Sequence, residues 1–88
     1  MATLSEKERD DLPDSAFAFP KERKEPLVDA GHVRDAVARF DQVEGVDNRE
    51  RDAAWGRIQR AATEHDVELE ERDWRELYRR NGRAVPRD

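Results

Sequence analysis

The sequence predicts an all-α fold in which an extended N-terminal strap lies over an antiparallel two-helix hairpin followed by a shorter third helix. Two stretches repeat apolar residues at helical spacing, each of them after an aspartate that can cap a helix. The break between them is about five residues long, which favours antiparallel neighbours. Three prolines within residues 12–26 exclude a helix before the first stretch.

The composition limits the chain to one small domain with a thin core. Its 88 residues include 17 Lys or Arg and 22 Asp or Glu, so 44% are charged and the net charge is -5. Leu, Ile, Val and Phe together supply 16 of the 88 residues, close to the level that marks disordered chains. There is no cysteine, which excludes disulfides, thiolate catalysis and Cys-ligated zinc.

The N-terminal part divides into a tail and a strap. Residues 1–11 (MATLSEKERDD) are mostly charged and predict a disordered tail. Phe17 and Phe19 are two residues apart, and in an extended chain their side chains point to the same side. We therefore expect this segment to be a strap laid over the helices, followed by a solvated loop at KERKE.

Three helices are expected after the strap. Asp29 caps a helix over 30–42, and Asp47 with Glu50 forms a capping box before a helix over 48–65. Val67 and Leu69 alternate with charged residues and predict a short extended connector.

A third helix in ERDWRELYRR ends at Asn81-Gly82. Within it we expect ion pairs four residues apart, Glu71 with Arg75 and Glu76 with Arg80. Residues 12–80 then form one domain, and 81–88 form a flexible tail.

The predicted core gathers the apolar residues of all these segments. Its members are Phe17, Phe19, Leu27, Val33, Val37, Phe40, Val46, Trp55, Ile58, Ala62, Val67 and Leu69, joined by Trp74 and Leu77 if the third helix docks.

Residues 12–69 also carry a family resemblance. They read LPDSAFAFPKERKEPLVDAGHVRDAVARFDQVEG, followed by the helix RDAAWGRIQRAATEHDVEL. This order resembles a small helical family of unknown function in short actinobacterial proteins, and is similar to a module appended to some phage head and head-protease proteins. The resemblance implies a helical fold and no catalytic or ligand residue. The chain departs from the phage-type pattern at Glu25, where that pattern has Tyr, and at Asp66, where it has Gly.

No arrangement of residues predicts catalysis, a metal or a cofactor. The hairpin brings His32 and His65 towards each other, but two histidines without a ligand motif are usually structural. The serines lie outside any nucleophile motif, and the glycines are isolated and form no phosphate-binding loop. We therefore expect no enzyme activity.

Two binding functions are left. The third helix places Trp74, Leu77 and Tyr78 on one face, which either docks within the chain, the alternative we favour, or binds a protein partner. Nucleic acid is the second candidate, through the arginines in and around the C-terminal helix: Arg72, Arg75, Arg79, Arg80 and Arg83. A pI of 5.1 disfavours it.

The sequence thus predicts a non-catalytic protein-interaction or accessory module that works as a monomer with an unknown protein partner. The acidic N-terminus lacks the basic start and apolar run of a signal peptide, and no apolar stretch is long enough to span a membrane. We therefore expect a cytoplasmic protein without a membrane partner.

Overall fold

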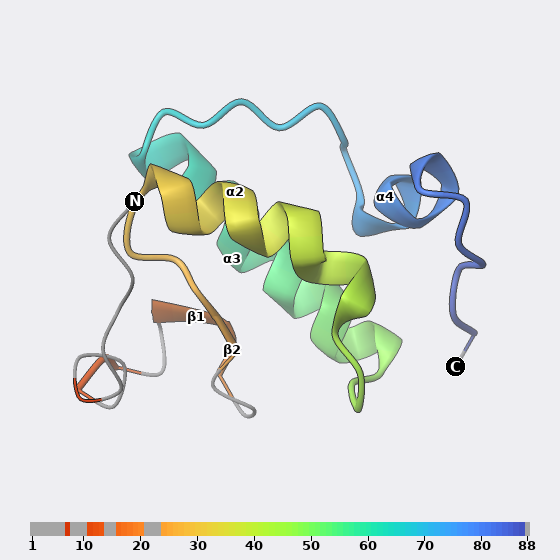
Figure 1. The fold of residues 1–88 in the computed structure, drawn as a ribbon, viewed down its shortest axis with the longest axis horizontal. Helices are drawn as coiled ribbons and strands as arrows, with labels where there is room; N and C mark the ends of the chain where they lie inside the picture. Colours follow the sequence, from red (N-terminus) through yellow and green to blue (C-terminus); the bar gives the residue numbers. More distant parts are fainter. Residues whose placement is uncertain (1–6, 8–10, 14–15, 21–23, 88) are drawn as a thin grey trace.

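In the part of the chain that the structure describes beyond residue 16, the fold consists of a short β-hairpin and three α-helices around one core. The computed structural model describes residues 7, 11–13, 16–20 and 24–87, and the predicted tail over 1–11 lies mostly outside them. In chain order the main elements are β1 (Phe17–Phe19), β2 (Lys24–Pro26), α2 (Ala30–Arg39), the 3-10 turn η2 (Phe40–Gln42), α3 (Asn48–Glu64) and α4 (Trp74–Arg80). The helices α2 and α3 lie side by side in opposite directions, and α4 lies where α2 ends and α3 begins (Figure 1).

The β-hairpin corrects the all-α prediction, so the fold is mostly helical. Strand β1 pairs antiparallel with β2, with Phe17 opposite Pro26 and Phe19 opposite Lys24. The expected loop at KERKE therefore supplies part of a strand. Three-residue strands are too short to show an apolar alternation, which is why the sequence did not reveal this pairing. The predicted strap is otherwise confirmed, because Phe17 and Phe19 are buried against the helices.

Both predicted helix starts are confirmed by their caps. The carboxylate of Asp29 accepts a hydrogen bond from the backbone N–H of His32 at 2.8 Å, and Asp47 accepts one from Glu50 at 2.8 Å. Each cap satisfies one of the backbone donors that a helix start leaves unpaired. The first helix tightens into η2 for its last turn, within the predicted range of 30–42.

The third helix begins later than its charged residues suggest. Because α4 starts at Trp74, Glu71 lies outside it, and the expected pair of Glu71 with Arg75 is wrong. The expected pair of Glu76 with Arg80 is also wrong, because Arg80 pairs with Glu70 and Glu71. The carboxylate of Glu76 instead accepts a hydrogen bond from the backbone N–H of Arg72 at 3.2 Å, just before the helix.

An aromatic junction joins η2, β1, α3 and α4 in the core. The ring of Phe40 lies 5.5 Å from that of Phe19, 5.6 Å from that of Trp55 and 6.1 Å from that of Trp74, measured between centroids. These partners come from β1, α3 and α4, so Phe40 connects three elements that are distant in the sequence. All four aromatic side chains are buried.

Four predicted core residues are less buried than the rest. Most of the predicted core is confirmed, including Trp74 and Leu77 of the docked third helix. The exceptions are only half-buried and pack against the edge of the core: Val37, Val46, Val67 and Leu69.

The chain turns out of α3 through a backbone conformation that favours glycine. Asp66 has a φ of 55°, and the N–H of Val67 reaches back to the carbonyl of Ala62 at 2.8 Å. This is the Schellman arrangement, whose left-handed residue is most often Gly. Asp66 thus stands at a position where the backbone itself favours Gly, and Glu25 likewise has a positive φ, of 60°.

The C-terminal segment contacts the helical body. The buried carboxylate of Asp41 accepts a hydrogen bond from Asn81 Nδ2 at 3.0 Å and pairs with Arg83 Nε at 3.1 Å. Farther along, Asn48 Nδ2 donates to the carbonyl of Pro86 at 2.8 Å. The segment predicted as a flexible tail therefore makes specific contacts over 81–87. In the described part of the chain, no helix has the length and apolar character needed to cross a bilayer.

Phe40→Ala should remove the junction and lower the free energy of unfolding by about 3–5 kcal/mol, the usual cost of truncating a buried Phe. The free energy of unfolding of a small domain is roughly 5–15 kcal/mol in total, so the variant should unfold at a much lower urea concentration. Urea unfolding followed by circular dichroism measures the loss. The exposed neighbour Gln42→Ala is the control and should stay within about 0.5 kcal/mol. A loss below about 1 kcal/mol for Phe40→Ala would contradict the role assigned to Phe40.

Asp66→Gly should raise the free energy of unfolding by about 0.5–1 kcal/mol, because Gly adopts a positive φ without the steric cost of a Cβ atom. The matched control is Arg60→Gly, which introduces Gly on an exposed face inside α3 and should lower stability by about 1 kcal/mol. Thermal unfolding of both variants tests the two signs. Equal destabilisation by the two substitutions would show that the turn does not select for Gly.

Candidate functional site

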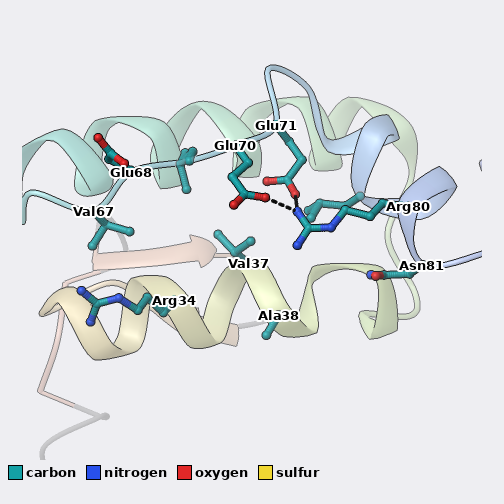
Figure 2. A pocket seen from close by; sticks show the side chains of 11 residues that line it. Arg34, Val37, Ala38, Val67, Glu68, Glu70, Glu71, Arg80 and Asn81 are labelled. Carbon is teal, nitrogen blue, oxygen red and sulfur yellow. Dashed lines mark hydrogen bonds and ion pairs between the residues drawn. The ribbon is translucent and has the colours of Figure 1, made fainter.

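The candidate site is a groove between α2, the extended connector (residues 67–71) and α4 (Figure 2). Its volume is about 560 Å³, within the range of ligand and peptide pockets. Helix α2 contributes Arg34, Val37 and Ala38, and the C-terminal end of α4 closes one end of the groove.

The floor of the groove is apolar and only partly covered. Val37, Val67 and Leu69 are half-buried there, and Leu77 from α4 also lines the groove, with 4% of its surface exposed. Val67 and Leu69 reach the floor because alternate side chains of an extended segment point to the same side. Val37 faces it from α2, one helical turn after the buried Val33.

A cluster of three charged side chains closes the α4 end of the groove. The guanidinium of Arg80 pairs with Glu70 Oε2 at 2.9 Å and also with the carboxylate of Glu71 (Figure 2). The side chain of Glu71 is only 6% exposed, whereas that of Arg80 is 59% exposed. A buried carboxylate needs such a partner, so Arg80 is held against the connector.

The other charged side chains of the rim point into water. Glu68 and Arg34 are exposed, and no hydrogen bond or ion pair joins their side chains to another residue in the described ranges. Among these residues, the groove therefore has one end where Arg80 pairs with two carboxylates and one open end, where a carboxylate and a guanidinium face solvent on opposite walls.

The predicted partner-binding face on the third helix is part of the core. Trp74, Leu77 and Tyr78 are 0%, 4% and 5% exposed, so intramolecular docking is confirmed and no free apolar face is left on α4. The indole N–H of Trp74 donates to Asp52 at 2.7 Å, and its ring packs against that of Tyr78. Of these three residues, Leu77 lines the groove.

The five arginines proposed for nucleic-acid binding do not act as one free cationic surface. Arg80 pairs with Glu70 and Glu71, and Arg83 with Asp41. Arg75 pairs with Asp73 at 3.2 Å and Asp52 at 3.3 Å, and its pKa is raised chiefly by the hydrogen bond to Asp73. The remaining two, Arg72 and Arg79, are exposed.

Asp29 and His32 form a contact at the start of α2. His32 Nδ1 lies 2.8 Å from Asp29 Oδ1, and electrostatic interactions with His32 and His65 favour the ionised form of that carboxylate. The pKa of Asp29 is lowered, mainly because the backbone N–H of His32 donates to its ionised form and also because the His32 ring does so. In the described ranges, no three His, Cys, Asp or Glu side chains gather closely enough to hold a metal ion. The cluster therefore acts as a helix cap.

The groove itself was not identified from the sequence. We expected its floor residues, Val37, Val67 and Leu69, in the core, and the one candidate partner-binding face lay on α4, where docking within the chain was the favoured alternative. The alternation in VELE was a usable signal, because it marks an extended segment with one apolar side. The docking of α4 determines which apolar residues stay uncovered. No local sequence pattern predicts that docking.

Comparison with known proteins places the chain in a family. No curated protein and no solved structure shows a significant match. The family model described as a family of unknown function (DUF6582) matches residues 2–72, which include the hairpin, α2, α3 and the connector and end before α4. This confirms the general prediction of a family of unknown function, and because the match covers most of the sequence, the chain belongs to the DUF6582 family.

Proposed function

We propose that the protein is a cytoplasmic, non-catalytic interaction module that binds another protein in the groove between α2, the extended connector and α4. One observation carries this proposal. Four residues of the expected core are only half-buried, and three of them, Val37, Val67 and Leu69, line this one groove.

The apolar composition makes that clustering informative. Isolated apolar residues on a surface are normal, whereas a contiguous apolar floor with a charged rim is typical of an interaction site. The chain has few large apolar side chains, yet it leaves three of them together and partly exposed. Burial of these side chains by a partner would supply the favourable free energy of binding.

The lining of the groove supports a protein partner. Its walls carry charged side chains of both signs, and its apolar floor lies between α2 and the connector (Figure 2).

Nucleic-acid binding through the C-terminal arginines is the alternative, and it has less support. Arg75, Arg80 and Arg83 already have carboxylate partners, which a phosphate would have to displace. A gel-shift series at low salt separates the two functions, since phosphate contacts weaken steeply as salt rises. Salt-sensitive retardation of duplex DNA or RNA would favour the alternative.

Val67→Asp should weaken partner binding at least tenfold, because it places a carboxylate on the apolar floor, where a partner would have to desolvate it. The matched control is Val46→Asp, which makes the same change at a half-buried valine outside the groove. The measurement starts with affinity capture from an extract of the source organism. A captured protein is then purified and titrated calorimetrically against the intact chain and both variants.

The expected result is a stoichiometric complex with the intact chain and Val46→Asp, and at least a tenfold weaker one with Val67→Asp. Circular dichroism spectra of the two variants should match that of the intact chain, which shows that both are folded. Equal binding by the two variants, or no stoichiometric complex at all, would rule out the groove as the docking surface.

A further inference from the structure

The backbone of the extended connector is unusual in lacking partners within the described chain. The N–H of Val67 still bonds to Ala62, but in the described part of the chain no hydrogen bond involves the backbone N–H or C=O groups of residues 68–71. Figure 1 shows this segment running alone across the molecule from the end of α3 to α4. Backbone groups are strong donors and acceptors, so water satisfies them in the free protein.

The same segment has the side-chain pattern of an edge strand. Leu69 points to the groove floor, while Glu68 and Glu70 are exposed. The groove lies next to the connector along its length, since residues 67–71 all line it (Figure 2). Neighbouring strands lie about 4.7–4.9 Å apart, and the groove of about 560 Å³ has room for a short extended segment.

We propose that the partner binds as an extended segment that pairs with residues 68–71 and so adds a strand to them. This inference rests on the proposed function and specifies the form of its partner. A helix placed in the groove would cover the apolar floor but would leave the connector's backbone groups unpaired, because its own are used internally. An extended segment covers the floor and pairs with those groups at the same time.

The charges of the connector define the side chains of that segment. Glu68 is exposed with no partner in the described ranges, whereas Glu70 forms an ion pair with Arg80. Residues directly opposite on paired strands interact, and opposite charges there are favourable. The partner should therefore alternate apolar residues, which face Val37 and Leu69, with Lys or Arg opposite Glu68. The net charge of -5 favours a basic partner as well.

The pairing can be tested by amide hydrogen exchange in NMR, with the synthetic peptide acetyl-Lys-Val-Lys-Val-Lys-Val-amide as the probe. In the free protein the amides of residues 68–71 should exchange rapidly. With the peptide bound, alternate amides should become protected, because successive N–H groups of a strand point to opposite edges. Protection of one pair, either 68 and 70 or 69 and 71, supports the proposal.

Three outcomes would overturn it. The first is a shift of the Val37 and Leu69 methyl signals without amide protection, and the second is equal protection of all four amides. The third is no binding at millimolar peptide. The two proposals can fail separately. If Val67→Asp loses the captured partner and the peptide shifts the methyl signals without protecting amides, the groove is still the docking surface and only the strand pairing is rejected.

A charge reversal tests the stated chemistry of the partner. Glu68→Lys should weaken binding of the Lys-Val peptide about two- to five-fold, as expected for one cross-strand charge pair. It should strengthen binding of the corresponding Glu-Val peptide. The matched control, Glu64→Lys, makes the same change on an exposed position of α3 outside the groove and should change neither affinity by as much. Equal effects of the two variants would reject Glu68 as a specific contact.

Discussion

The ring of Phe40 is the contact on which the rest of this structure depends. It packs against Phe19, Trp55 and Trp74, which lie on three elements that are distant from one another in the sequence. Each aromatic pair contributes about 0.5–1.5 kcal/mol beyond the area it buries. The chain has no cysteine, so these contacts hold the hairpin and α4 against the helix pair without help from a disulfide.

Because the large side chains are concentrated at this junction, the opposite edge of α2 is only partly covered. Only 16 of the 88 residues are Leu, Ile, Val or Phe, and few are left to cover the opposite edge of α2. Val37 and Leu69 therefore remain half-exposed. The groove follows from the same scarcity that places the chain near the composition of disordered proteins.

Local features of the sequence predicted the helices well, and contacts between distant residues account for the features that it did not predict. The caps at Asp29 and Asp47 lie three residues from the donors that they bind, so their pattern is readable in the sequence. The pairing of β1 with β2 and the ion pairs of Arg80 depend on where separate elements meet. For Arg80, an i, i+4 rule pointed to Glu76, whereas the late start of α4 put Glu71 within reach.

The pair of Arg80 with Glu71 also limits how a partner can bind. The carboxylate of Glu71 is nearly inaccessible, and removing its guanidinium would leave a buried charge without a partner, which costs several kcal/mol. A basic residue of the partner that displaced Arg80 would gain one ion pair and break another. Binding is more favourable at a carboxylate that is unpaired in the free protein, and among the described residues of this groove that carboxylate is Glu68. The connector thus directs a basic partner away from α4 and towards its own N-terminal half.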